Sequence, residues 1–582
     1  MNEAISRLDL LLRNCQLVNV CSREIYSTDI SIRDGRVLSI EPRASAEAAS
    51  MIDCAGLFAV PGMIDAHMHV DTTLLWPTEL ARVLVPLGTT SVFVDTTNVS
   101  HTGGKDAVRA LMESFRGLPL KGFAVAPSYT PFNPRLETAA VELSSEDICA
   151  LLDEGCVGIG ETVWSKIVLG DGDYLEGIKA CRDRGKRVSG HGGEIARGDE
   201  AAFDAYTTAG LQDDHCVSIP EDILPRLRRG LKLFCVEASG RRGQLAPLIR
   251  EAVIQNRPFR QMCLCVDNIT IMDIHGAGHG YLDNLVRIAL KEGVPPVDAF
   301  RMVSLEPAEH YRRARDVGCI APGRAADILL MRSLGDFPPE KVIVDGRIVA
   351  ERGRLMVDIP PARVPDFYRH SIHLGKVDWK QLEIPALAGH ESVRARVINT
   401  HDGDAYNEAS LEKVRVENGA ITVDPEHDIL KIVMVERYGR HGEMGVALVR
   451  GFGLRRGAMA TSMTIPSNNI AAVGVSDNDI RFAIERVGEI QGGYVVVADG
   501  KIRAEVRLPL GGIMAEEPFE GLVAQIAVAE TAARELGCGL VHPLFTLAQT
   551  VLSTLPALGL TDQGLVDARS ARVVAVIGES PA

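Results

Sequence analysis

Two histidines separated by one residue are the first candidates for metal chemistry in this sequence. His67 and His69 lie in Ile64-Asp65-Ala66-His67-Met68-His69, directly after an apolar run that is typical of a buried strand. Alternate residues of a strand face the same side, so both imidazoles can bind one cation. The alternative is a pair of surface histidines, and this spacing alone does not decide between the two interpretations.

Four more side chains that can bind a metal come at the ends of later predicted strands. They are Glu161, His191, His215 and Asp267. The carboxylates have an alternative role, since a carboxylate at the end of a strand often caps the next helix. Six such groups favour a metal site, and imidazole and carboxylate ligands suit Zn, Fe or Mn. The number of ligands predicts two divalent metal ions per chain, with Glu161 between them.

Alternating strands and helices are predicted to position these groups between residues 61 and 318. The expected strands are 91–95, 122–127, 157–161, 188–190, 212–215, 232–237 and 262–267, and the expected helices include 79–87, 173–184, 200–209 and 279–292. This pattern predicts an α/β fold, a (β/α)₈ TIM-type barrel whose active site lies at the C-terminal ends of the strands. A doubly wound open sheet is the alternative, but the Gly-rich turn that usually follows its first strand is missing from the sequence.

The regions that flank the barrel have different patterns. Residues 1–60 and 319–358 contain short strands and hairpin turns such as Asp34-Gly35, and we expect them to form one small β-domain split around the barrel. A Pro-rich stretch at 359–365 indicates a boundary. Residues 366–582 are predicted to form an additional C-terminal α/β domain.

Composition excludes several classes of function. The chain has 582 residues and a formal net charge of -15, so it has no electrostatic footprint for nucleic acid or for an anionic membrane. An apolar run of about 18 residues is also missing, which argues against a transmembrane helix. The polar N-terminus does not resemble a signal peptide, and the 12 cysteines are scattered, so we expect a cytoplasmic protein with reduced thiols.

Longer motifs resemble those of a known family. Pro61-Gly62-Met63-Ile64-Asp65-Ala66-His67-Met68-His69 looks like the signature of the amidohydrolase superfamily. The segments that resemble adenine deaminases in particular are 190–192, 209–215, 305–311 and 320–327 in the first part of the chain, and 451–454, 492–497 and 560–565 in the last part. The resemblance covers nearly the whole chain.

This resemblance implies a set of roles. His67, His69, Glu161, His191, His215 and Asp267 would be the metal ligands. Asp267 and Glu161 would be the catalytic carboxylates, with Asp267 also handling the proton of the attacking water. The expected reaction is metal-dependent hydrolysis of a C–N bond in a small N-heterocycle, and the enzymes that the chain resembles are often dimers or larger homo-oligomers.

The sequence departs from the family where substrate is expected. Asp95-Thr96-Thr97-Asn98 stands in place of the family's Asp-Pro-His-Glu, and Val236-Glu237-Ala238-Ser239 in place of Arg-Glu-Gly-Ser. Residues 464–469 read Thr-Ile-Pro-Ser-Asn-Asn in place of Ser-His-Asp-Ser-His-Asn. Since all six ligands are kept while these groups differ, we interpret the pattern as a changed substrate.

Five residues are predicted to contact that substrate. They are Asn98, Trp164, Glu237, Ser239 and His279. Glu237 has the alternative of facing water at the end of a strand, and Trp164 that of simple packing. The pair Arg241-Arg242 is expected to be solvated, although either guanidinium could instead bind a substrate carboxylate through two hydrogen bonds.

Three hypotheses for function remain at this point. The first is a deaminase of an amino-substituted heterocycle such as adenine, and the second is a ring-opening hydrolase of a cyclic amide or hydantoin. Release of ammonia distinguishes them. The third is a non-catalytic metal-binding homologue, which need not hold stoichiometric metal; the complete ligand set weighs against it.

Overall fold

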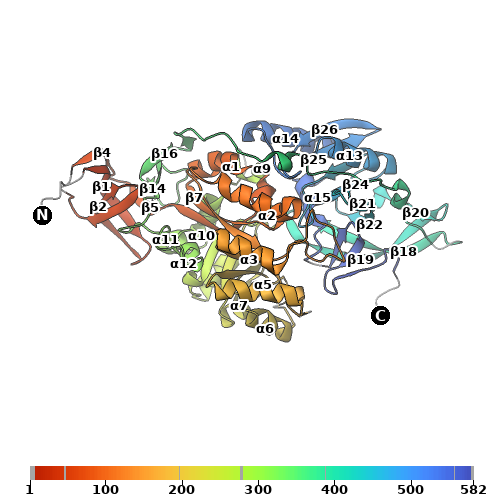
Figure 1. Ribbon diagram of the computed structural model, residues 1–582, viewed down its shortest axis with the longest axis horizontal. Helices are drawn as coiled ribbons and strands as arrows, with labels where there is room; N and C mark the ends of the chain where they lie inside the picture. The colour runs from red at the N-terminus through yellow and green to blue at the C-terminus, as the bar shows by residue number, and fades with distance from the viewer. Residues whose placement is uncertain are drawn as a thin grey trace.

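Three regions follow one another along the long axis of the molecule (Figure 1). The computed structural model describes residues 7–44, 47–168, 170–193, 195, 197–275, 279–386, 389–555 and 557–578. The N-terminal strands lie at one end, the strand–helix repeats in the middle and a C-terminal sheet at the other end. Within the described ranges, none of the helices has the length and apolar character needed to cross a bilayer.

The central region is a barrel of eight parallel strands. Five of them form one sheet in the order β10-β9-β8-β7-β6 and three form another in the order β11-β12-β13. Their bounds are β6 Met63–Met68, β7 Thr89–Asp95, β8 Lys121–Pro127, β9 Gly158–Val163, β10 Arg187–His191, β11 Asp213–Val217, β12 Lys232–Val236 and β13 Met262–Cys265.

Backbone hydrogen bonds close the circle between the two sheets. Gln212 N donates to Val188 O at 3.1 Å beside β10, and Asp267 N donates to His67 O at 3.0 Å between the end of β13 and β6. The prediction of a TIM-type barrel is therefore confirmed.

Helices surround this barrel where the sequence has amphipathic segments. Those that follow strands include α1 Pro77–Leu84, α2 Thr97–Ser114, α3 Ser145–Glu154, α5 Gly172–Asp183, α6 Glu200–Thr208, α7 Ile223–Arg228, α8 Leu245–Ile254 and α10 Leu282–Lys291. Side-chain caps start several of them: Ser144 begins α3, Asp171 begins α5 and Asp199 begins α6. The helix expected from residue 79 to 87 ends at Leu84 and continues as a short 3₁₀ turn, because Pro86 has no N–H to donate.

The strands that precede the barrel in the sequence and those that follow it form one sheet. Its order is β17-β16-β15-β14-β5-β1-β2-β3, with β4 paired to β1. The bounds are β1 Leu8–Asn19, β2 Glu24–Arg33, β3 Arg36–Glu41, β4 Ala48–Asp53, β5 Phe58–Pro61, β14 Ile328–Met331, β15 Lys341–Val344, β16 Arg347–Glu351 and β17 Arg354–Leu355. Pairing of β5 with β14 joins the two halves, while the proposed domain boundaries stay predictions.

The apolar run that precedes His67 forms two strands, which are separated by Gly62. The first half, β5, belongs to the sheet shared by the flanking segments, and the second half, β6, belongs to the barrel. A Cβ at Gly62 would lie 2.3 Å from Thr90 Oγ1, so only glycine fits at this crossing.

The C-terminal region is a nine-stranded sheet with helices beside it. The strand order is β20-β19-β18-β22-β21-β24-β23-β25-β26. The bounds are β18 Ser392–His401, β19 Asp404–Glu417, β20 Ala420–Ile421, β21 Leu430–Val435, β22 Met444–Arg450, β23 Ala458–Thr461, β24 Ile470–Gly474, β25 Gly493–Ala498 and β26 Lys501–Arg507, with helices α13 Asp477–Glu489, α14 Phe519–Glu535 and α15 Pro543–Thr550.

Polar contacts attach this region to the mouth of the barrel. Ala405 N donates to Gly240 O at 2.7 Å, and Asn468 Nδ2 donates to Asn98 O at 3.2 Å. Both barrel residues follow the C-terminal ends of strands. The C-terminal region therefore covers the end of the barrel where the predicted ligands lie.

Candidate metal centre and active site

All six residues predicted as metal ligands meet at the C-terminal ends of the barrel strands. His67 is the last residue but one of β6, and His69 directly follows that strand. Glu161 lies in β9, and His191 is the last residue of β10. His215 lies in β11, and Asp267 follows β13. Each of the six side chains is buried, with Glu161 the most exposed at 7%.

Glu161 lies at the centre of this group. Its Oε1 is 3.4 Å from His67 Nε2, 3.1 Å from His69 Nε2 and 3.5 Å from His215 Nε2. Its Oε2 is 2.8 Å from His191 Nδ1. One carboxylate is therefore within reach of all four imidazoles.

Asp267 faces two of these imidazoles, those of His67 and His69. Its Oδ1 is 3.5 Å from His67 Nε2 and 3.6 Å from His69 Nε2. Asn268 Nδ2 donates to the same oxygen at 2.7 Å, and Arg241 Nη2 lies 3.5 Å from Oδ2. Neighbours on both sides thus fix the direction of this carboxylate.

The backbone is strained at both carboxylates. Glu161 has φ 53° and Asp267 has φ 55°, in the left-handed region that side chains other than glycine seldom adopt. Shifts in strand register occur close to the other ligands, between Val188 and Gly190 in β10 and between Asp214 and Val217 in β11. Such strain and irregularity cluster at functional sites, where they aim side chains.

The charges of the cluster shift its titrating groups in different directions. Burial acts to raise the pKa of Glu161, but the charges of His191 and His215 outweigh it and hold that pKa well below its usual range. Burial and the charge of His67 lower the pKa of His215 well below its usual value. Burial also acts to lower the pKa of His67 and of His69, but the facing carboxylates outweigh it, so that the pKa of His67 lies well above its usual value and that of His69 rises to about 9. A cation bound beside these two imidazoles would therefore displace their protons.

The residues present fit a divalent metal. Four buried imidazole nitrogens have no hydrogen-bond partner among the described residues: His67 Nε2, His69 Nδ1, His191 Nε2 and His215 Nδ1. Ligand atoms of His67, His69, Glu161 and Asp267 all lie within 4.8 Å of one another. A cation would give His67 Nε2, which faces both carboxylates, the partner that it lacks.

A buried ion pair holds two of the strand ends. Asp214 Oδ1 accepts from Gly192 N at 3.3 Å and from Cys216 N at 2.8 Å. Arg226 Nε donates to Asp214 Oδ2 at 2.9 Å, and both side chains are fully buried. Since Gly192 follows His191 and Cys216 follows His215, this carboxylate fixes the backbone beside two of the predicted ligands.

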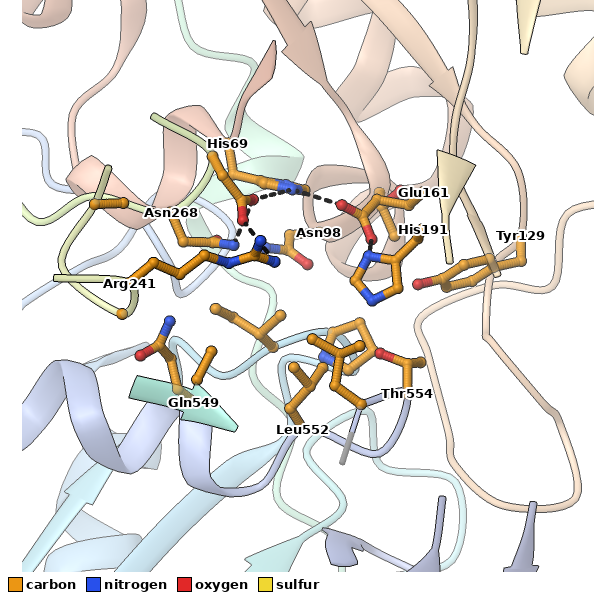
Figure 2. A pocket seen from close by; sticks show the side chains of 18 residues that line it. His69, Asn98, Tyr129, Glu161, His191, Arg241, Asn268, Gln549, Leu552 and Thr554 are labelled. Carbon is orange, nitrogen blue, oxygen red and sulfur yellow. Dashed lines mark hydrogen bonds and ion pairs between the residues drawn. The ribbon is translucent and has the colours of Figure 1, made fainter. Parts of the chain in front are cut away.

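A cavity opens beside the metal cluster, between the barrel and the C-terminal region (Figure 2). The barrel contributes His69, Thr97, Asn98, Tyr129, Glu161, His191, Ala238, Gly240, Arg241, Asp267 and Asn268. The C-terminal region contributes Ala405, Ile465, Pro466, Gln549, Leu552, Thr554 and Leu555. One wall is therefore rich in charge and the other is mostly apolar.

Of the five predicted substrate contacts, Asn98 lines this cavity, where its Nδ2 donates to Asp71 Oδ2 at 2.7 Å. Glu237 instead accepts from Gly243 N and Leu245 N at the start of α8. Ser239 donates to Asp273 Oδ2 at 2.7 Å. These two residues, Trp164 and His279 are outside the cavity lining, and their contacts with substrate stay predictions.

The expectation that Arg241 is solvated was wrong. Its residue is 3% exposed and lines the cavity, whereas the side chain of Arg242 is 26% exposed and bonds to Asp402 at 3.1 Å. The cause is the contact between Gly240 and Ala405, which places the C-terminal region over Arg241. Sequence reasoning also missed Gln549, Leu552 and Leu555, because α15 and the residues after it contain no motif that marks a binding site.

Comparison with known proteins agrees with this architecture. Residues 58–349 match the amidohydrolase family, and residues 405–572 match the adenine deaminase C-terminal domain. Adenine deaminase from Desulforamulus reducens is 34% identical over 98% of this chain and 96% of that protein, and the one from Moorella thermoacetica is 35% identical over the same shares. Among solved structures, the L-hydantoinase of Arthrobacter aurescens has a TM-score of 0.41 and 18% identity, covering 60% of this chain and 98% of that one. The near full-length matches show that the chain belongs to the adenine deaminase family of amidohydrolases.

Proposed function

We propose that this protein catalyses metal-dependent hydrolytic deamination of a small aminated N-heterocycle. Adenine, which would give hypoxanthine and ammonia, is the first compound to test. The buried cluster of four histidines and two carboxylates carries this proposal, because it lies at a cavity in a member of the adenine deaminase family. We further propose two divalent ions per chain, Mn, Fe or Zn, with Glu161 between them.

The residues of the chain have distinct tasks in this reaction. A bound divalent metal supplies water whose pKa is lowered towards neutrality. Burial acts to raise the pKa of Asp267, but its contact with His67 at 3.5 Å and the other positive charges nearby outweigh burial and lower that pKa below the usual range, so the carboxylate is ionised. Its carboxylate accepts the proton of the attacking water and passes it to the leaving nitrogen.

Two further features support the substrate step. Asn268 and Arg241 hold the Asp267 carboxylate, so that its oxygens need not reorient during the transfer. Ile465, Leu552 and Leu555 cover the ring-binding side of the cavity and exclude bulk water from it.

Ammonia release tests the proposal directly. The purified protein is loaded with Mn, Fe or Zn in turn and assayed with aminopurines such as adenine, with pterins and with hydantoins. We expect ammonia from at least one aminated ring and no ring opening of hydantoins. Hydantoin opening without release of ammonia would show a ring-opening hydrolase instead. A protein that holds less than one metal ion per chain after loading, and that turns over none of these compounds, would be a non-catalytic homologue.

A further inference from the structure

Arg241 brings a buried positive charge into the substrate cavity. Its Nη1 donates to His215 O at 2.7 Å, and its Nη2 lies 3.5 Å from Asp267 Oδ2. A guanidinium has five N–H donors, so these two contacts do not use all of them. Figure 2 shows the guanidinium extending into the cavity between Asn268 and Asn98.

Arg241 shares its carboxylate partner with other groups. Asp267 is its partner among the charged residues that line the cavity, and that carboxylate also faces His67 and His69 and accepts from Asn268. A buried cation is costly unless it is fully paired and hydrogen-bonded, so a further anionic or carbonyl oxygen would stabilise it.

Polar amides lie next to the guanidinium. Asn268 Oδ1 is buried and has no hydrogen-bond partner among the described residues. The amide of Gln549 packs over Gly240, where a Cβ would lie 2.1 Å from Gln549 Nε2. Both amides line the cavity beside Arg241 and can bond the N–H and C=O groups at the edge of a ring.

We propose that Arg241 binds an oxygen substituent of the substrate, and that the preferred substrate is a planar aminated heterocycle bearing a carboxylate or a ring oxo group. The proposal rests on the deamination proposed above and narrows its substrate class. Arginine pairs well with such oxygens, since its planar fork can donate two parallel hydrogen bonds. Adenine has no oxygen substituent, so it is the poorer substrate.

Matched pairs of compounds test this inference. Adenine is compared with its 2-oxo derivative, and pterin with pterin-6-carboxylate, on the wild type and on Arg241→Met. We expect the wild type to favour the member with the additional oxygen group (2-oxoadenine or pterin-6-carboxylate) in at least one pair by roughly tenfold or more in kcat/KM, the size expected for a charged hydrogen bond. In Arg241→Met, KM for that member should rise by a similar factor, while KM for its partner changes by less than about twofold.

The responding pair identifies the oxygen: the pterin pair indicates a carboxylate, and the adenine pair a ring oxo group. Equal losses of kcat for both members of each pair, with no difference between them in the change of KM, would show that Arg241 only positions Asp267, and would overturn the proposal. So would a wild type with no preference in either pair. Arg242→Met is the matched control, because Arg242 bonds to Asp402 outside the cavity lining, and it should leave the preference unchanged.

Binding separates this inference from the proposed reaction. If no aminated ring releases ammonia, the deamination proposal fails, and calorimetric titration of the metal-loaded protein still tests Arg241. Tighter binding of pterin-6-carboxylate than of pterin, or of 2-oxoadenine than of adenine, lost in Arg241→Met, would support the inference; equal binding within both pairs by the wild type would overturn it. If Arg241→Met does not fold, Arg241→Lys keeps the charge without the planar fork and should weaken the same preference.

Discussion

Asp267 is the residue on which the proposed chemistry depends most. Its carboxylate faces His67 and His69 on one side and is held by Asn268 and Arg241 on the other. The amide of Asn cannot accept a proton from water, so we expect Asp267→Asn to lower turnover by roughly 10²–10⁴-fold. Metal content should stay nearly intact, because four histidines and Glu161 remain. Ammonia release and metal analysis on the same sample test this, and full activity would exclude the role given to Asp267.

The sequence was more informative about the ligands than about the cavity. All six predicted ligands come together, because each is a metal-binding residue type at the end of a strand and parallel strands bring those ends to one mouth. Arg241 could not be placed in this way. Its burial depends on Ala405, which is distant in sequence and reaches Gly240 only after the C-terminal region has docked.

At the scale of elements, the ends of β10 and β11 depend on the Asp214–Arg226 pair. Asp214→Asn removes the nearer carboxylate of a fully buried guanidinium and leaves it only Asp222, 3.5 Å away, so we expect a loss of about 3 kcal/mol in the free energy of unfolding. Metal affinity should fall by roughly 10–100-fold, because the backbone beside His191 and His215 is no longer fixed. Denaturant unfolding and metal titration measure the two effects.

A surface ion pair provides the control for this variant. Asp183 bonds to Lys179 at 2.9 Å on α5, where the side chains are 63% and 67% exposed. Asp183→Asn should change the free energy of unfolding by less than about 1 kcal/mol, as exposed pairs usually do. Equal effects of the two variants would contradict a structural role for the buried pair.

The positions of the strands and helices were largely predictable from the periodicity of apolar residues in the sequence. The strand and helix alternation between residues 61 and 318 was correctly predicted, because buried parallel strands and amphipathic helices leave strong patterns. The errors lie at boundaries. The interruption at Gly62 depends on contact with Thr90 of β7, and a local pattern contains no information about that contact.

At the scale of the whole molecule, His542 joins the C-terminal region to the barrel. His542 immediately precedes α15; its Nε2 lies 2.9 Å from Asp273 Oδ1, in the barrel helix α9 Ile271–Ile274, and its Nδ1 lies 2.7 Å from Glu530 Oε1 in α14. Arg242 is 4.0 Å from Asp273, and Arg534 is 3.2 Å from Glu530. A protonated His542 therefore holds two carboxylates from different regions together, while a neutral one leaves them facing each other.

This arrangement predicts how stability depends on pH. Burial acts to lower the pKa of His542, but its hydrogen bonds with Asp273 and Glu530 outweigh burial and raise the pKa to about 9. A group whose pKa rises on folding stabilises the fold fully below its unfolded value, near 6.5, and loses that effect as pH rises through the folded value. The contribution is on the order of 3 kcal/mol below pH 6.5 and disappears above about pH 9.

Comparison with His542→Gln measures this contribution. The gap in Tm between wild type and variant should be largest near pH 6 and close to nothing at about pH 10, because glutamine does not titrate. His401→Gln replaces an exposed histidine of the same region, and its Tm should follow that of the wild type across the range. A gap that stays constant with pH would mean that the charge of His542 does not attach the C-terminal region. The cavity would then keep its apolar wall through other contacts between the two regions, such as those of Ala405 and Asn468.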